Sequence, residues 1–109
     1  RRSMIYTAFI GQEPAGYMSL LERGIDSVVA VTDLVVNLAD RRQGVGSALL
    51  AAAQDWAGGR SHRRLIIEMQ SKNMPVIRLA QKFGYEFCGY NDQYYPTQDV
   101  ALFFGRALK

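Results

Sequence analysis

Two glycines follow a pair of arginines at residues 41–46, in the order Arg-Arg-Gln-Gly-Val-Gly, directly after an apolar run. Glycine lets the backbone approach a ligand and adopt a positive φ, and the first N–H groups of a helix have no partner inside that helix. The helix dipole adds partial positive charge at the same end, where phosphate binds well. A tight turn with solvated arginines is the alternative. The spacing indicates an anion site where Gly44 and Gly46 lead into a helix over 45–57.

Three other side chains are candidates for proton transfer. Glu68 lies in an apolar segment, which raises the pKa of a carboxyl and suits it to act as a general base; a solvated or ion-paired glutamate is the alternative. Asp33 interrupts an apolar run, and burying an acid costs free energy. We therefore expect it either to have a catalytic role or to form a hydrogen bond with a neighbouring loop. Tyr94, with Tyr95 beside it in a polar loop, would reach a substrate or pack that loop onto the sheet.

The composition describes one globular domain over residues 1–109, with 49% hydrophobic residues and a net charge of +3. No run approaches the ~20 apolar residues that cross a bilayer, and the first residues lack a signal-peptide pattern, so we expect a cytoplasmic protein without membrane contact. The basic residues cluster at 41–42 and 60–64 rather than in a long stripe interleaved with aromatics. This argues for a phosphate-bearing ligand and against nucleic acid.

The chain has one cysteine, Cys88, and one histidine, His62. A lone cysteine excludes an internal disulfide and a multi-cysteine zinc site, and we expect no metal. Cys88 alternates with aromatic residues and is predicted to be a small core residue. His62, amid cationic neighbours, is predicted to lie in a surface loop.

Hydrophobic periodicity predicts the elements that would position these groups. Alternating residues predict strands over 4–11 and 15–23, and a nearly continuous apolar run over 28–38 predicts a central strand covered on both faces. The remaining predicted elements are a helix over 45–57, a strand over 64–70, a short helix that begins near Pro75 and ends at Gly84, and strands over 85–90 and 100–108.

Each predicted helix carries an apolar stripe, and the strand over 64–70 alternates between two faces. The expected stripes are Val45, Ala48, Leu49, Ala52 and Trp56 in the first helix, and Val76, Leu79, Ala80 and Phe83 in the second. In the strand, Leu65, Ile67 and Met69 share one face, and Ile66, Glu68 and Gln70 share the other.

This order of elements predicts an α/β (α+β) fold with a mixed, mostly antiparallel sheet. The strand–helix–strand unit in the middle implies a parallel pair, since a crossover is needed to return the chain in the same direction. The flanking hairpins imply antiparallel edges, and the helices pack on the faces of the sheet.

Two segments resemble the GNAT superfamily of acetyl-coenzyme A-dependent N-acetyltransferases, and the likeness covers nearly the whole chain. The first is Arg41-Arg42-Gln43-Gly44-Val45-Gly46, similar to the family signature of Arg or Gln, two residues, Gly, one residue, and Gly or Ala after a long strand. The second is "NMPVIRLAQKFGYEFCGY" at 73–90, in which an asparagine opens a helix that ends in a Phe-Gly-Tyr turn. The resemblance implies a GNAT-like fold with a splay between the third and fourth strands.

The resemblance also implies a cofactor site for acetyl-coenzyme A. Backbone amides from Arg42 to Ser47 would hold the pyrophosphate, and an unpaired strand edge would pair with the amide-bearing pantetheine arm. The residues implied are Leu34, Val35 and Val36 on the strand edge, Arg41, Arg42, Gln43, Gly44, Val45, Gly46 and Ser47 in the loop and helix start, and the side chain of Asn73. Glu68, five residues before Asn73, is placed like the base of the ribosomal-protein N-terminal acetyltransferases.

The chain departs from the family in two places. Ala80 stands where many members carry a tyrosine that protonates the leaving thiolate, and Tyr94 or Tyr95 would have to replace it. The sequence also begins at what looks like the family's second strand, as a truncated or minimal domain would. The apolar surface left uncovered predicts self-association, for example as a homodimer.

We therefore expect an N-acetyltransferase that moves an acetyl group from acetyl-coenzyme A to a primary amine by direct attack, with Glu68, Asp33 and Tyr94 as catalytic candidates. The acceptor is a small molecule or a protein N-terminus. The segment "IEMQSKN" resembles enzymes that modify streptothricin, whereas "YYPTQD" resembles the protein N-terminal enzymes. The alternative is a non-catalytic acyl-coenzyme A-binding regulatory domain, which the alanine at position 80 favours; a general phosphate or nucleic-acid binder ranks third.

Overall fold

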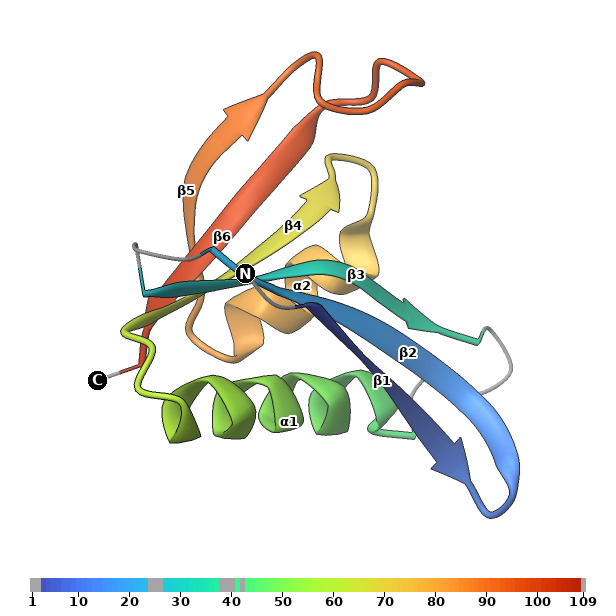
Figure 1. Cartoon of the computed structure of the whole chain (residues 1–109). Helices are drawn as coiled ribbons and strands as arrows, with labels where there is room; N and C mark the ends of the chain where they lie inside the picture. The colour runs from blue at the N-terminus through green and yellow to red at the C-terminus, as the bar shows by residue number, and fades with distance from the viewer. Residues whose placement is uncertain (1–2, 24–26, 38–40, 42, 109) are drawn as a thin grey trace.

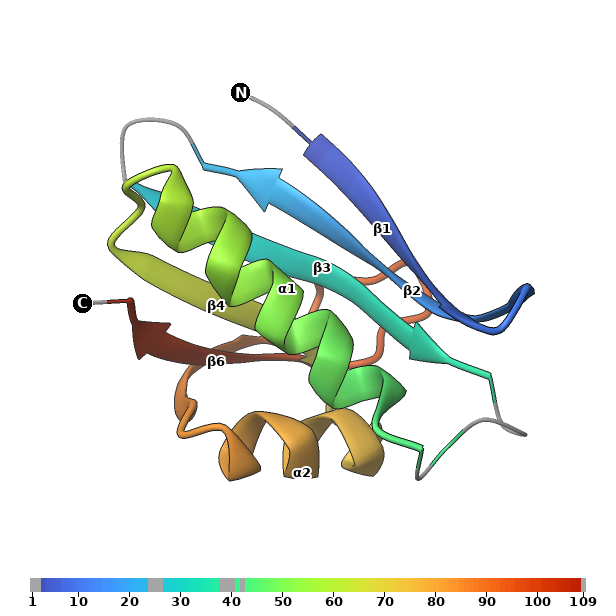
Figure 2. The same cartoon turned by 90° about the horizontal axis from the view of Figure 1, so that it is seen from below.

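The computed structural model describes residues 3–23, 27–37, 41 and 43–108. Within them, six strands form one sheet in the order β1-β2-β3-β4-β6-β5 (Figure 1). Both helices lie on the same face of this sheet (Figure 2). The elements are β1 (Ser3–Ile10), β2 (Glu13–Glu22), β3 (Val28–Val36), α1 (Val45–Gly59), β4 (Arg64–Gln70), α2 (Met74–Lys82), β5 (Glu86–Asn91) and β6 (Ala101–Ala107).

The sheet has the predicted mixed pattern. The strands β3 and β4 run parallel, because α1 crosses between them, and the other neighbouring strands pair antiparallel. In the described helices, no segment is long and apolar enough to cross a membrane. No three His, Cys, Asp or Glu side chains of the described residues are grouped as a metal site would require.

The central strand β3 is covered on both faces only over its first half. Residues 28–31 are buried and pair with residues 64–67 of β4, but the ladder stops there. On the other side, Ser19 pairs with Asp33 and Leu20 with Val31, so Thr32 forms a β-bulge. A bulge bends its strand, and beyond it β3 diverges from β4 (Figure 1). The prediction of full coverage is therefore wrong for Asp33 and Val35, which are exposed.

Alternation along β4 is confirmed. Leu65, Ile67 and Met69 are buried beneath the helices as part of the main core. Ile66 and Glu68 belong to the opposite face, where they line a pocket described below. The sheet therefore carries Glu68 on the face that the helices do not cover.

The buried face of α1 differs from the predicted stripe. Its buried residues are Val45, Leu49, Leu50, Ala53 and Ala57, whereas Ala48 is exposed. Nearly every residue of this helix is apolar, so spacing alone does not single out a face, and packing on the sheet selects it. The helix also continues through Gly58 and Gly59, two residues beyond its predicted end. In α2, Val76, Ile77 and Ala80 are buried, while Leu79 and Phe83 are only partly so.

Cys88 is exposed, so its prediction as a core residue is wrong. The register between β5 and β6 shifts between Phe87 and Gly89, which leaves Cys88 without an opposite residue. Strand β5 is also at the edge of the sheet. Alternation with aromatic residues could not reveal this irregularity.

His62 lies in the loop between α1 and β4, as predicted, but its side chain is partly buried in a side-chain cluster. Its Nε2 lies 2.6 Å from Oε2 of Glu22, and its ring stacks on Trp56 with centroids 6.4 Å apart. Arg60 donates to the same carboxylate oxygen at 2.8 Å and also lies over the indole of Trp56. The cluster ties the end of α1 to the end of β2.

Glu22 is expected to make stability depend on pH in the acid range. Hydrogen bonds from Arg60 and His62 lower its pKa from 4.5 to about 2. A carboxyl whose pKa is lowered by folding stabilises the folded state above its unfolded pKa, and the contribution is lost as pH falls through the folded pKa. Glu22→Gln should therefore lower the thermal midpoint at neutral pH, with a difference that shrinks as pH falls from 4.5 toward 2. A difference independent of pH would contradict this; Glu86→Gln is the control.

Candidate functional site

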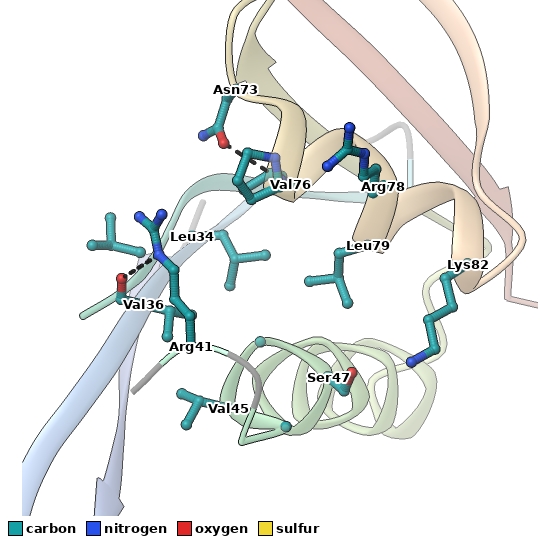
Figure 3. Close-up of a pocket in the computed structure, with 14 residues that line it drawn as sticks. Leu34, Val36, Arg41, Val45, Ser47, Asn73, Val76, Arg78, Leu79 and Lys82 are labelled. Atoms are coloured by element: carbon teal, nitrogen blue, oxygen red, sulfur yellow. Dashed lines mark hydrogen bonds between the residues drawn. The ribbon is translucent and has the colours of Figure 1, made fainter. Parts of the chain in front are cut away.

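A groove of about 570 Å³ lies between the end of β3, the start of α1 and the length of α2 (Figure 3). Of the cofactor residues expected from the sequence, all but two line it. Gln43 is described but is not among the lining residues, and Arg42 lies outside the described residues. The groove is lined by Leu34, Val35, Val36, Arg41, Gly44, Val45, Gly46, Ser47, Asn73, Pro75, Val76, Arg78, Leu79 and Lys82.

The start of α1 forms the floor of the groove. Gly44 precedes the helix with a φ of +78°, a conformation that favours glycine, and no side chain caps the first amides. The first turn contains no acidic residue. A Cβ on Gly46 would lie 3.1 Å from Cδ2 of Leu79 and 3.7 Å from Cγ2 of Val36. The missing side chain therefore keeps open the space between α1 and α2.

Positive charge surrounds this floor. Arg78 and Lys82 project from α2 on one side, and Arg41 lies on the other, where its Nε donates to the carbonyl of Val36 at 3.4 Å (Figure 3). The described lining contains no acidic side chain. The groove therefore favours an anionic ligand. Sequence reasoning missed Arg78 and Lys82, although their spacing of four residues places them on one face of a helix.

A second, smaller pocket of about 170 Å³ lies where β3 and β4 diverge, and we call it the inter-strand pocket. It shares Leu34, Val35, Asn73 and Val76 with the groove, so the two adjoin. Because the ladder to β4 has ended, the β4-facing edge of β3 offers backbone groups to a ligand. Asn73 begins α2 at this point by accepting a hydrogen bond from the amide of Val76 at 3.3 Å.

A third pocket of about 530 Å³, the outer pocket, lies on the sheet face opposite the helices. Its lining combines apolar, polar and cationic side chains. Glu68 is the residue that the outer pocket and the inter-strand pocket share. The outer pocket is lined by Leu21, Arg23, Ile66, Glu68, Cys88, Asn91, Tyr94 and Phe103.

Glu68 is only 7% exposed, and this burial raises the pKa of its carboxyl. The hydroxyl of Tyr94 donates to its Oε1 at 3.0 Å and opposes that shift, as does the nearby charge of Arg23. The charge of Asp33, which lines the inter-strand pocket, raises the pKa of Glu68 further. A buried carboxyl with a raised pKa and one oxygen held by a phenol is suited to accept a proton.

The three catalytic candidates from the sequence therefore lie around one point. Tyr94 contacts Glu68 directly, and Asp33 lines a pocket with Glu68. The ring of Tyr94 packs edge-to-face against Phe103 and Tyr95, with centroids 5.8 and 5.2 Å apart. Ala80, by contrast, lies on the buried side of α2 and has no group for proton transfer.

The divided mixed sheet, with a glycine turn leading into the helix beside the division, is shared with a solved acetyltransferase structure. A model of the acetyltransferase (GNAT) family matches residues 1–85, and the chain belongs to this family.

Three relatives extend the comparison. Over 96 residues, the chain is 31% identical to a streptothricin acetyltransferase of Escherichia coli, covering 88% of this chain and 55% of that protein. A crystal structure of a nourseothricin acetyltransferase superimposes with a TM-score of 0.90 at 25% identity, covering 98% of this chain and 66% of that one. A structure of a Bacillus anthracis str. Ames protein in complex with acetyl coenzyme A gives 0.84 at 23% identity, covering 98% and 63%. The chain thus spans between about half and two thirds of the length of these proteins.

Proposed function

We propose that this chain transfers an acetyl group from acetyl-coenzyme A to a primary amine of a small molecule. The observation that carries the proposal is the position of Glu68, which lines the inter-strand pocket and the outer pocket. A donor that enters from the groove and an acceptor that enters from the opposite face would meet at this carboxylate. A structural relative solved with acetyl coenzyme A supports the choice of donor.

The groove fits coenzyme A by its chemistry. The uncapped amides after Gly44 and the cations Arg41, Arg78 and Lys82 would hold phosphate oxygens. The edge of β3 would pair with the amides of the pantetheine arm, which leads toward the inter-strand pocket. Bound there, acetyl-coenzyme A supplies an acetyl group activated as a thioester.

Glu68 would accept the proton that the attacking amine loses. Only a neutral amine has the lone pair needed for attack, and the nitrogen must shed a proton as the new bond to carbon forms. The raised pKa of Glu68 brings its basicity closer to that needed near neutral pH. The hydrogen bond from Tyr94 to Oε1 would hold the carboxylate while the other oxygen faces the amine.

The outer pocket favours a small acceptor. Its volume of about 530 Å³ lies within the range of roughly 300–1,000 Å³ typical of small-molecule sites. Ile66 and Phe103 offer apolar contact, and Asn91 offers an amide for a polar substituent. An amine of the streptothricin class fits this description and agrees with the activity named for the E. coli relative.

Thermal unfolding with acetyl-coenzyme A, coenzyme A or ATP tests the donor site. At about 100 times the dissociation constant, a ligand adds about 2.7 kcal/mol to stability, which raises the midpoint of a domain of this size by roughly 10–20 °C. Gly46→Val should abolish the shift, because the new side chain projects toward Leu79 and Val36 in the groove. Gly58→Val is the matched control in the same helix, since a Cβ at Gly58 meets no atom within 4 Å.

Thiol release from acetyl-coenzyme A, measured with streptothricin and with N-terminal peptides as acceptors, tests the transfer. Release with streptothricin and not with peptides supports the proposal, and the reverse would assign the acceptor to protein N-termini. Binding without transfer to any amine would favour the non-catalytic regulatory domain. A chain that gives no thermal shift with either form of coenzyme A would contradict both functions.

A further inference from the structure

Acetyl transfer from a thioester also needs a proton for the departing sulfur, and the inter-strand pocket limits which group can give it. The polar side chains there include the carboxylates of Asp33 and Glu68, which serve as acceptors when ionised, and the amides of Gln70 and Asn73, which are not acids near neutral pH. While Asp33 and Glu68 are ionised, the phenol of Tyr95 is the acidic O–H group in this described lining. A phenol and an alkyl thiol have similar acidities, so proton exchange between them is feasible.

Tyr95 is oriented differently from its neighbour in the chain. Tyr94 lines the outer pocket and donates a hydrogen bond to Glu68, whereas Tyr95 lines the inter-strand pocket. The two rings meet edge-to-face at 83°. The hydroxyl of Tyr95 makes no hydrogen bond to any described residue, so it is available to a ligand. Burial and the nearby carboxylates raise its pKa, which keeps the phenol protonated at neutral pH.

The loop that carries Tyr95 is anchored close to the pocket. The amide of Gln98 donates to the carbonyl of Tyr95 at 2.9 Å and closes a turn, and Asp99 accepts a hydrogen bond from Thr97 at 2.8 Å. Lys72, in the turn between β4 and α2, lies 3.1 Å from the same carboxylate. The amide of Ser71, in that turn, donates to the carbonyl of Val100 at 2.9 Å. These contacts fix the loop to the end of β4, beside the inter-strand pocket.

We propose that Tyr95 protonates the leaving sulfur, a role that rests on the proposed acetyl transfer. As the amine nitrogen bonds to the acyl carbon, its proton passes to Glu68. As the carbon–sulfur bond breaks, the sulfur keeps the electron pair and takes the phenolic proton of Tyr95, which yields a thiol. Glu68 then releases its proton to water and Tyr95 regains one. The net change is one proton moved from nitrogen to sulfur.

Tyr95→Phe tests this role because it removes only the hydroxyl and keeps the ring that packs against Tyr94. We expect kcat to fall by about 10²-fold or more, with the KM for acetyl-coenzyme A changed less than about twofold. A binding readout is independent of turnover. The pKa of the thiol of bound coenzyme A, followed by thiolate absorbance, should rise by about one unit in the variant, because the phenol no longer donates to the thiolate.

Tyr90→Phe is the matched control, since Tyr90 is 66% exposed on β5, and it should leave kcat and the bound thiol pKa unchanged. If the wild type transfers acetyl groups and Tyr95→Phe changes neither kcat nor the thiol pKa, Tyr95 is not the acid while the proposed function stands. If the wild type binds coenzyme A but transfers to no amine, both proposals fail together. Thermal unfolding of each variant shows whether the protein is still folded, so that an effect of the missing hydroxyl can be distinguished from unfolding.

Discussion

Replacing Glu68 with glutamine is expected to lower kcat/KM for acetyl transfer by about 10²- to 10⁴-fold, the usual range for loss of a general base. The glutamine has the same shape, and its amide oxygen can still accept from Tyr94, but it has no basic oxygen for the proton of the amine. Binding of acetyl-coenzyme A should change little, because Glu68 lies outside the groove that would hold the phosphates. The loss should therefore be confined to transfer.

Two further measurements sharpen this result. Because burial raises the pKa of Glu68, the wild-type rate should fall as pH is lowered through that raised pKa. The residual rate of Glu68→Gln should not show this decrease. A carboxyl whose pKa is raised by folding destabilises the folded state above that pKa, so the variant should unfold at a higher temperature at neutral pH. Glu86→Gln, on β5, should alter neither property. An unchanged kcat/KM in Glu68→Gln would exclude this residue as the base.

Replacing Gly16 with alanine is expected to destabilise the fold by about 1–3 kcal/mol, the usual cost of overpacking. A Cβ at this position would lie 2.5 Å from the carbonyl oxygen of Val35 and 3.2 Å from Cα of Val36. Both are backbone atoms, so β2 and β3 must separate to admit the methyl group. The thermal midpoint of a domain of this size should fall by roughly 4–8 °C per kcal/mol.

The same substitution at Gly58 provides the control. A Cβ there meets no atom within 4 Å, and alanine is favoured over glycine in a helix by up to about 1 kcal/mol, so Gly58→Ala should be neutral or stabilising. Gly16→Ala should also weaken acetyl-coenzyme A binding, because Val35 and Val36 line the groove. Equal midpoints for the two variants would show that β2 tolerates a side chain at this point.

Most of the fold could be predicted from the sequence, because its elements have strong periodicity and clear ends. The strand Arg64–Gln70 and the start of α1 at Val45 were predicted at their observed residues. The errors fall where local pattern carries no information. A β-bulge at Thr32 and a register shift beside Cys88 depend on the partner strand, and both reverse the expected burial of a side chain.

The candidate site was predictable where a motif acts through the backbone, and less so where side chains converge from distant segments. The glycine turn before α1 and Asn73 line the groove as expected. The contact between Glu68 and Tyr94 joins residues 26 apart in the chain. Nothing local to either residue predicts that contact. The cluster of Glu22 and His62 joins residues 40 apart, and no local pattern predicts it.

The four-residue ladder between β3 and β4 divides the sheet into two half-sheets, β1–β3 and β4–β6–β5. The two halves are joined by that short ladder and by α1, which packs across β1 to β4. A ligand lying along the divergent edge would touch β3 on one side and α2 on the other. Such a ligand would contact both sides of the opening, so part of its binding free energy would stabilise one relative orientation of the two halves. We therefore expect the affinity for acetyl-coenzyme A and the rigidity of the sheet to be coupled in this chain.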